Sequence, residues 1–439
     1  MDFHKWTKDN PNIASVNVAT PDLNGVLRGK NILSSQLYKL NNGDFRMPFS
    51  IQNLDIWGRD IEGSSWVYET GDIDANCIWT GRGPLPVNWL KNKSALIPVT
   101  LSLDDGSSFQ GDPRSFLKKI MQNYQEKNLK VVVGIELEFY IFEKNKFNNN
   151  TEGLEIENAY SINEIDIKEE FFNQVRCACE EQNISILSNV SECGSGQFEI
   201  VLNHNDDLVK VADDIIFLKY LIKGIAERNN LKASFMPKPT FEGSGSGLHV
   251  HLSIWDKNNK NIFNNETQKG SDSLKYALGG LIKTMPELTL IMAPHLNSFR
   301  RLALESHAPN IISWGYDNRT TAIRVPSGSN KSRRLEYRVA GSDVNPYLLL
   351  SSIAESCLLG LNESLIPPKE TKGNAYNSNN KSLPSGWREA IENFKNGSFI
   401  KKTFPKELYQ MFLDCKLQEY KTLATKITPT ELITYLDTV

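Results

Sequence analysis

The chain has 439 residues, of which 40% are hydrophobic and 23% charged, and its formal net charge is −3. This length suits one large domain with a smaller one, and this charge balance does not favour nucleic acid or acidic membranes as partners. No apolar run approaches the roughly 20 residues that span a bilayer, and the N-terminus lacks a secretory hydrophobic segment. The six cysteines are scattered without zinc-type spacing. We therefore expect a cytoplasmic protein with reduced thiols.

The first hundred residues predict a small β-rich domain. Strand-like stretches cover 13–19 and 95–103, and turns are expected at Asn24-Gly25 and Asn42-Gly43. The polar, turn-rich stretch 104–113 marks a boundary. We expect two domains, 1–108 and 109–439.

Helical spacing and cap residues predict the helices of the larger domain. Asp112 and Pro113 can cap and open a helix over 115–128, and Thr428 and Pro429 can do the same for the last helix. The other expected helices cover 168–182, 208–229, 274–285, 345–361 and 406–423. Loops are expected over 143–151, 293–325 and 367–386.

Four strands of the larger domain each combine a polar face with an apolar face. They cover 130–142, 197–202, 247–253 and 333–339. Because alternate residues of a strand share a face, the polar faces carry Glu136, Glu138, Glu199, His249, His251, Ser253, Arg334, Glu336 and Arg338, with Glu192 close by. One such strand alone is typical of a solvated sheet edge, but four strands of this design indicate a site.

The residue types on these faces predict bound metal and phosphate. Packed carboxylates repel one another unless a cation lies among them. Carboxylates with a histidine suit Mg²⁺ or Mn²⁺, and their number suits two ions gripping a phosphate. Arginines bind carboxylate and phosphate in two-point fashion, and this part of the chain holds Arg301, Arg319, Arg324, Arg334 and Arg338. ATP with a carboxylic acid fits this set.

Ordered motifs in the chain resemble those of the glutamine synthetase superfamily. They are Gly134-Ile-Glu-Leu-Glu-Phe139, Gly196-Gln-Phe-Glu199, Phe235-Met-Pro-Lys-Pro239, Gly245-Ser-Gly-Leu-His-Val-His-Leu-Ser253, Asn297-Ser-Phe-Arg-Arg301, Asn318-Arg-Thr-Thr-Ala-Ile-Arg-Val-Pro326, Arg334-Leu-Glu-Tyr-Arg338 and Asn345-Pro-Tyr347. The resemblance covers nearly the whole chain. It implies an α+β fold, with a small β-grasp-like N-terminal domain and a large catalytic domain of antiparallel strands flanked by helices. It also implies a ring-shaped homo-oligomer, commonly a dodecamer, with active sites shared between subunits.

The resemblance further implies a role for each matching residue. Glu138, Glu192 and Glu199 would hold one Mg²⁺ or Mn²⁺ ion, and Glu136, His249 and Glu336 the second. His251, Ser253, Lys331 and Arg334 would contact ATP, Arg319, Arg324 and Arg334 would clamp phosphate, and Gly245, Arg301 and Arg338 would hold glutamate. The implied reaction forms a γ-glutamyl phosphate, from which an amine then displaces phosphate.

Three departures bear on the amine. His307 stands where ammonia-using members carry a Glu, the usual Phe-Asp-Gly-Ser-Ser stretch is absent, and Ser244 replaces a frequent Asn. Asp55, Asp60 or Asp74 could replace the missing Asp, and His307 could still accept a proton. The flanking motifs Asn24-Gly-Val-Leu-Arg-Gly-Lys30, Glu69-Thr-Gly-Asp72, Trp314-Gly-Tyr-Asp-Asn-Arg319 and Val339-Ala-Gly-Ser-Asp-Val-Asn-Pro346 resemble γ-glutamylputrescine synthetase and its relatives.

These observations predict an ATP-dependent ligase that joins glutamate to an organic amine, putrescine-like or a small alkylamine. Three alternatives stay open: glutamine synthetase using ammonia, a phosphagen kinase, and a non-catalytic structural relative. The kinase lacks support from the N-terminal motifs. A scaffold would have no reason to keep buried carboxylates.

Overall fold

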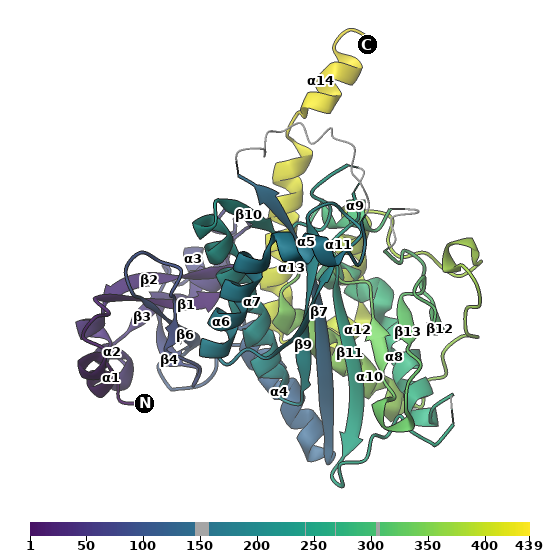
Figure 1. Cartoon of the computed structure of the whole chain (residues 1–439), viewed down its shortest axis with the longest axis horizontal. Coiled ribbons are helices and arrows are strands. Elements are labelled where there is room, and N and C mark those ends of the chain that lie inside the picture. The colour runs from purple at the N-terminus through teal and green to yellow at the C-terminus, as the bar shows by residue number, and fades with distance from the viewer. Residues whose placement is uncertain (145–157, 242, 268, 304–307) are drawn as a thin grey trace.

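The computed structural model describes residues 1–144, 158–241, 243–267, 269–303 and 308–439. It contains two β-sheets with helices packed around them (Figure 1). The smaller sheet has the strand order β2-β1-β6-β4-β3, with β5 paired to β6; β1 and β6 are parallel and the other pairs antiparallel. Its strands are β1 (Ser15–Pro21), β2 (Leu27–Leu33), β3 (Arg46–Pro48), β4 (Asp74–Trp79), β5 (Leu85–Pro86) and β6 (Ala95–Ser102), accompanied by the short helices α1 (Phe3–Asp9), α2 (Tyr38–Asn42) and α3 (Ser65–Tyr68).

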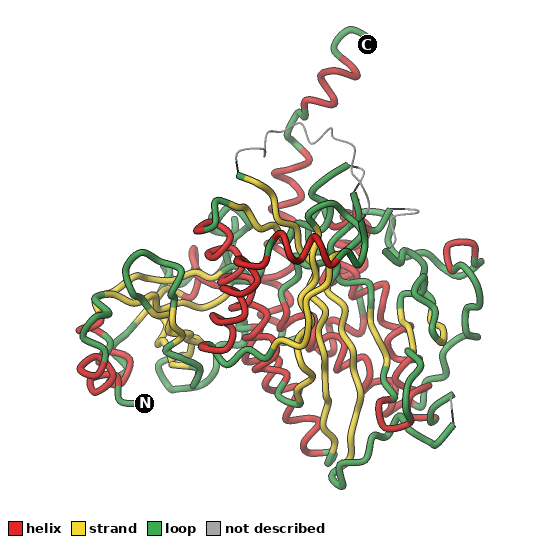
Figure 2. The backbone as a smooth tube through the Cα atoms, in the orientation of Figure 1, coloured by secondary structure: helices red, strands yellow, loops and turns green. Residues whose placement is uncertain are grey.

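The larger sheet has the order β12-β13-β14-β11-β7-β9-β8, with β10 paired to β7, and its long strands run side by side in Figure 2. All its pairs are antiparallel except β12 with β13. Its strands are β7 (Leu129–Glu143), β8 (Ile186–Ser191), β9 (Gln197–Asn205), β10 (Leu231–Ser234), β11 (Leu248–Asp256), β12 (Trp314–Tyr316), β13 (Ile323–Val325) and β14 (Leu335–Tyr337). The expected α+β class is confirmed; the boundary at 108/109 stays a prediction.

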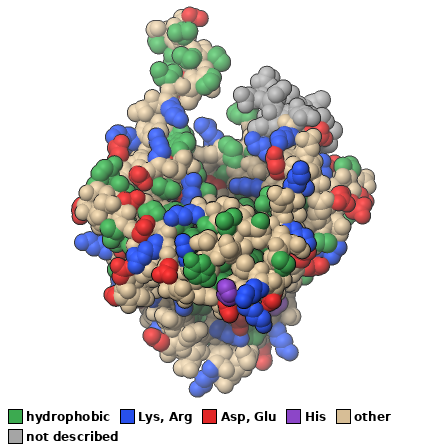
Figure 3. Space-filling view, turned by 90° about the vertical axis from the view of Figure 1, so that its left-hand side faces the viewer, with side chains coloured by type: hydrophobic (Ala, Val, Ile, Leu, Met, Phe, Trp, Pro, Cys, Tyr) green, Lys and Arg blue, Asp and Glu red, His purple; other side chains and the backbone are tan. Residues whose placement is uncertain are grey.

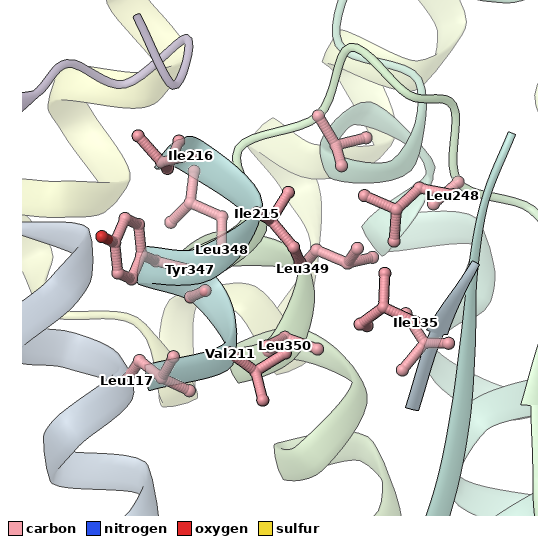
Figure 4. Packing of buried hydrophobic residues seen from close by; sticks show 14 of the residues in the cluster. Leu117, Ile135, Val211, Ile215, Ile216, Leu248, Tyr347, Leu348, Leu349 and Leu350 are labelled. Carbon is pink, nitrogen blue, oxygen red and sulfur yellow. The ribbon is translucent and has the colours of Figure 1, made fainter. Parts of the chain in front are cut away.

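Three helices bury the apolar side of this sheet: α4 (Pro113–Glu126), α7 (Leu208–Arg228) and α10 (Pro346–Glu363). Asp112 caps α4 as expected, accepting from the backbone N–H groups of Arg114 and Ser115. Figure 4 shows side chains of the three helices packed with those of β7 and β11: Leu117, Val211, Ile215, Leu349 and Leu350 with Ile135 and Leu248. Burial of this face fixes which side chains of the strands point the other way.

Helix α8 (Asp272–Met292) crosses α10 at very short range. A Cβ on Gly280 would lie 2.0 Å from the carbonyl oxygen of Ser356, and one on Gly360 would lie 2.0 Å from that of Tyr276. The helix runs seven residues beyond the predicted end at 285, with Pro286 inside it. Burial of the turns after this proline against neighbouring helices outweighs the lost backbone hydrogen bond.

The remaining helices cover the flanks and the C-terminus. They are α5 (Ile162–Ile167), α6 (Glu169–Glu181), α9 (Ser298–Arg301), α11 (Trp387–Asn396), α12 (Ser398–Thr403), α13 (Lys406–Ala424) and α14 (Pro429–Tyr435). Helix α14 projects from the body, and hydrophobic side chains lie on its surface (Figures 1 and 3). Thr428 caps it in a capping box with Glu431.

None of the helices in the described ranges is long and apolar enough to cross a lipid bilayer. The six cysteines are all free thiols, as expected. Most of the loop expected over 143–151 lies outside the described residues. The loop-rich stretch expected over 293–325 contains the short elements α9, β12 and β13.

Candidate active site

The polar faces of the central strands meet through direct cross-strand pairs. Glu136 on β7 lies opposite His249 on β11, Glu138 on β7 lies opposite Glu199 on β9, and His251 on β11 lies opposite Glu336 on β14. Residues paired in this way have Cβ atoms about 5 Å apart. Their sequence neighbours Ile135, Leu137, Leu248, Val250 and Leu335 are buried in the core, which holds the polar set on the opposite face.

The first predicted metal set is gathered at one point. Glu138, Glu192 and Glu199 each offer a carboxylate oxygen, and these atoms lie within 4.8 Å of one another. Glu192 follows directly after β8, and Glu138 and Glu199 are buried. Three carboxylates at this spacing are a hard-oxygen donor set that fits Mg²⁺ or Mn²⁺.

The second predicted set lies beside the first. Nδ1 of His249 is 2.9 Å from Oε2 of Glu136 and 4.0 Å from Oε1 of Glu336. Glu136, Glu199 and His249 form another group within 4.8 Å, and so do Glu136, His251 and Glu336. His251 is therefore as close to the acid cluster as His249, with Nε2 2.8 Å from Oε1 of Glu136. That the six residues of the two predicted sets bind metal stays a prediction.

The electrostatics of the cluster favour a bound cation. Burial, and then the charges of Glu136 and Glu138, raise the pKa of Glu199 to about 9. Burial and the charge of Glu138 raise the pKa of Glu192 to about 7. A divalent ion among these oxygens would remove the repulsion and let all of them ionise.

Two other carboxylates, Glu136 and Glu336, are stabilised in their ionised form by neighbouring side chains of the protein. Burial alone would raise the pKa of Glu136, but the hydrogen bonds to His249 and His251 outweigh it and lower the pKa. Burial likewise opposes ionisation of Glu336, and the charge of Arg338 overcomes it and lowers the pKa of Glu336. The cluster thus divides into Glu192 and Glu199, whose ionisation the protein opposes, and Glu136 and Glu336, whose ionisation it favours.

Glu138 is held by contacts that the strand pattern did not predict. The backbone N–H of Gly247 donates to its Oε2 over 2.6 Å, and Nε2 of Gln197 lies 3.5 Å from the same oxygen. The buried hydroxyl of Ser342 lies 2.6 Å from the carbonyl oxygen of Glu138 and 2.7 Å from that of Gly247. Ser342 is 204 residues away from Glu138, and the motif from Val339 to Pro346 that contains it did not predict this contact.

The predicted phosphate-clamping arginines surround the second metal set. Nη1 of Arg324 lies 3.0 Å from Oε2 of Glu336, and Arg338 pairs with Oε1 of the same carboxylate. Nε of Arg334 donates to Nδ1 of His251 over 3.1 Å. Arg319 is exposed, and its charge acts to lower the pKa of Glu192. The four cations therefore border the acid cluster.

The three predicted glutamate-binding residues lie together. Arg301 is 3% exposed, and its Nη1 donates to the carbonyl oxygen of Val339 over 2.7 Å. A Cβ on Gly245 would lie 2.5 Å from Cγ of Arg301, so the aliphatic stem of this arginine packs directly against the glycine backbone. Nη2 of Arg301 lies 3.2 Å from the carbonyl oxygen of Arg338.

The four predicted ATP-binding residues line one cavity of about 500 Å³ at the edge of the cluster. His251, Ser253, Lys331 and Arg334 share its wall with Glu136. Trp255, which the strand pattern did not single out, also lines it and donates from Nε1 to the hydroxyl of Ser253 over 2.9 Å. An aromatic residue in such a wall can pack against a nucleobase.

The structure describes some of the residues expected to complete the amine pocket. His307 lies outside the described residues. Asp55 has a fully buried carboxylate that pairs with Arg59 at 2.8 Å and accepts from the backbone N–H groups of Trp57 and Arg59. Because these contacts occupy Asp55 within its own turn, Asp60 and Asp74, which are both exposed, stay as candidates.

Comparisons with known proteins identify the family of the chain. The family model "Glutamine synthetase, catalytic domain" matches residues 110–435. Gamma-glutamylputrescine synthetase PuuA of Escherichia coli (strain K12) is 32% identical, over 98% of this chain and 93% of that protein. Glutamate–isopropylamine ligase of a Pseudomonas species is 29% identical over 98% and 96%, and a glutamine synthetase of Thermotoga maritima is 27% identical over 97% of each chain.

A solved structure described as "Apo GmaS without ligand" shares the fold. It has a TM-score of 0.85 and 23% sequence identity, and the match covers 99% of each chain. The family model spans the strands, the acid cluster and the arginines described above. The chain belongs to the glutamine synthetase family.

Proposed function

We propose that this enzyme, a ligase by its family, uses ATP to join the γ-carboxylate of L-glutamate to an organic amine, either putrescine-like or a small alkylamine. What carries the proposal for the amine is the extent of the resemblance. PuuA is 32% identical over 98% of the chain, including the N-terminal sheet. The glutamine synthetase of Thermotoga maritima, which also matches the N-terminal sheet, is 27% identical over 97%, and that of Clostridium saccharobutylicum is 33% identical over only 76%.

In the first step, a γ-carboxylate oxygen of glutamate attacks the terminal phosphorus of ATP, and ADP leaves with the bond electrons. Arg301 and Arg338 would hold the glutamate, and Arg319, Arg324 and Arg334 would offset charge on the transferring phosphoryl group. Two or more Mg²⁺ or Mn²⁺ ions, held by Glu138, Glu192 and Glu199 and by Glu136, His249 and Glu336, would supply neutralising charge. Support for the first set comes from Glu199 and Glu192, whose pKa values are raised without a cation. Support for the second set comes from the close approach of His249 to the carboxylates of Glu136 and Glu336.

In the second step, the amine nitrogen attacks the acyl carbon, phosphate leaves and the nitrogen loses a proton. We assign the proton acceptor to His307, because an imidazole has an ordinary pKa near 6.5 and can take a proton at neutral pH. The exposed Asp60 or Asp74 of a neighbouring subunit would complete the pocket.

An amine panel tests the proposal. Phosphate release and the γ-glutamyl amide product, identified by mass, are measured with glutamate, Mg²⁺-ATP and either putrescine, isopropylamine, methylamine or ammonium. We expect kcat/KM for one organic amine to exceed that for ammonium by at least about tenfold, which corresponds to about 1.4 kcal/mol. Equal or better turnover of ammonium would make the enzyme a glutamine synthetase, the alternative function. ADP release without an amide would indicate a kinase.

We propose that the enzyme works as a ring-shaped homo-oligomer, a dodecamer, with active sites shared between neighbours. Support comes from the family, whose members are generally oligomeric, and from the apolar surface of α14, where Ile433 and Leu436 are 87% and 72% exposed. Light scattering on the purified protein measures the mass. A monomeric enzyme with full activity would contradict the proposal.

A further inference from the structure

A second cavity, of about 720 Å³, lies where the small sheet meets the large domain. Its walls come from residues 24–27, from α7, from β10 with the segment after it, and from His295, Asn297, Ser342 and Asp343. None of the residues assigned above to metal, ATP or glutamate lines it. A volume of this size is typical of small-molecule sites.

Two lysines of this cavity, Lys219 and Lys223, form no ion pair with a carboxylate of the described residues. Lys219 and Lys223 lie one turn apart on α7, and their Nζ atoms are 5.7 and 5.6 Å from the centroid of the Phe235 ring. In the described part of the chain, neither Nζ has a carboxylate oxygen within 4.0 Å; Lys219 donates only to the carbonyl oxygen of Val344, over 3.3 Å. Two adjacent ammonium groups without a counter-charge repel each other.

Two acidic residues, Glu227 and Asp343, also line the cavity. The carboxylate of Glu227 pairs with Lys144. Asp343 accepts a hydrogen bond from the hydroxyl of Ser298 at Oδ2, over 2.6 Å, while its buried Oδ1 has no hydrogen-bond partner among the described residues. Burial lowers the pKa of Lys219 to about 7; the charge of Asp343 opposes this shift, and the charge of Lys223 adds to it to a smaller extent. The charge of Asp343 therefore does not offset the cost of burying the Lys219 ammonium.

Apolar side chains form the rest of the wall and are incompletely covered. Met236 is 43% exposed, Val26 is 37% exposed and Ile56 is 36% exposed, and all three line the cavity with Phe235. A ligand with a carbon body would cover this surface while its charged end met the lysines.

We propose that this cavity binds a small dianion, a phosphate monoester or a dicarboxylate, between Lys219 and Lys223. The carbon body of the ligand packs on Phe235 and Met236, and a hydroxyl or amino group of the same molecule donates to the free Oδ1 of Asp343. Placing the dianion there supplies the missing counter-charge in a hollow where water screens it only in part.

The cavity is also connected to the glutamate subsite, and this part rests on the proposed function. Asp343 bonds to Ser298, the first residue of α9, and α9 ends at Arg301. The neighbouring Ser342 contacts the carbonyl oxygens of Glu138 and Gly247. A bound dianion that shifts Asp343 therefore changes the position of Arg301 and the KM for glutamate.

Lysine reactivity tests the site without any assay of activity. The intact enzyme is treated with limiting acetic anhydride, and acetylation of Lys219 and Lys223 is followed by peptide mass spectrometry with inorganic phosphate, succinate or neither. At an anion concentration of four times Kd we expect about fivefold slower acetylation of both lysines, and an unchanged rate at Lys119, an exposed lysine on α4. The more protective probe identifies the class of ligand.

Two outcomes would overturn the proposed site. One is acetylation of both lysines at the same rate with and without either anion, up to an anion concentration of about 50 mM. This concentration would saturate a site with a Kd on the order of 1 mM. The other is a complete lack of reaction at both lysines without any anion, which would mean that another subunit covers the cavity.

Substitution tests the connection to glutamate. In the Lys219→Met/Lys223→Met double variant, the effect of succinate on the KM for glutamate is expected to disappear, whereas Lys119→Met retains it. An equal effect in the double variant would assign it to competition at the active site and reject the connection. If the wild-type enzyme itself shows no ligase activity, the proposed function is rejected, and the acetylation result still decides whether the cavity binds an anion.

Discussion

The backbone N–H of Gly247 donates to Oε2 of Glu138 over 2.6 Å. This contact links the loop before β11 to a carboxylate of β7, and it holds one of the predicted metal ligands in a fixed rotamer. The same glycine also lies against the predicted glutamate subsite, since a Cβ placed on it would be 2.6 Å from Nη2 of Arg301 and 3.0 Å from Nε2 of His249. The glycine therefore lies between the metal cluster and the substrate-binding arginine.

Gly247→Ala should impair both neighbours of this glycine. The added methyl group must displace the guanidinium of Arg301 or the imidazole of His249, so we expect the KM for glutamate to rise at least about tenfold. Steady-state kinetics at saturating ATP measures it. Gly386→Ala is the control, because a Cβ there meets no atom within 4 Å. An unchanged KM in the Gly247 variant would refute the placement of glutamate.

Glu199→Gln should weaken metal binding with little effect on the metal-free fold at pH 7. The raised pKa of Glu199, about 9, means that its side chain is mostly protonated without metal, and a glutamine resembles that state. We expect the increase in Tm on addition of Mn²⁺ to shrink, and the Mn²⁺ affinity to fall at least about tenfold. Glu126→Gln, on the exposed end of α4, is the control. An unchanged Mn²⁺ affinity would reject the site.

The stability of the metal-free enzyme should fall as the pH rises from about 5 to about 9. The folded pKa values of Glu199 and Glu192, about 9 and about 7, lie above the unfolded value near 4.5. The folded state therefore binds more protons across this range, so the free energy of unfolding decreases with pH. Urea unfolding in chelator at several pH values measures the slope. It should be shallower in Glu199→Gln, and a slope identical to that of wild type would contradict the assignment.

Ser342→Ala should destabilise the protein and disturb the site together. Its hydroxyl serves two carbonyl oxygens on neighbouring segments, and loss of a buried hydrogen bond costs about 1 kcal/mol. Ser352→Ala on α10 is the matched control, because the hydroxyl of Ser352 is buried without a partner in the described structure. Chemical denaturation compares the two variants. Equal free energies of unfolding would show that the Ser342 contacts contribute nothing.

The strand faces of the site were predictable because alternation has a fixed period. Burial of Ile135, Leu137 and Leu248 forces Glu136, Glu138 and His249 to the other side. Alternation could not predict which side chains bond across the strands. His251, expected at ATP, also contacts Glu136, since β11 lies between β7 and β14 and presents the histidine to both.

Contacts between distant segments escaped prediction for a different reason. The contacts of Ser342 with Glu138 and of Asp55 with Gln418 join residues more than 200 positions apart. The spacing of residues along the chain predicts neither contact, although Ser342 lies in a recognised motif. The sequence offered Asp55, Asp60 and Asp74 as equal candidates for the amine pocket, and the contacts of Asp55 with its own turn and with Gln418 set it apart from the other two. The helix end at 285 was wrong because a proline inside a helix is tolerated when packing compensates for it.

The crossing of α8 and α10 has a practical meaning for engineering this enzyme. Main chain touches main chain at Gly280 and Gly360, so exchanging side chains there cannot adjust the spacing. Mutant libraries made from this enzyme should keep both codons constant and place their diversity outside this helix crossing.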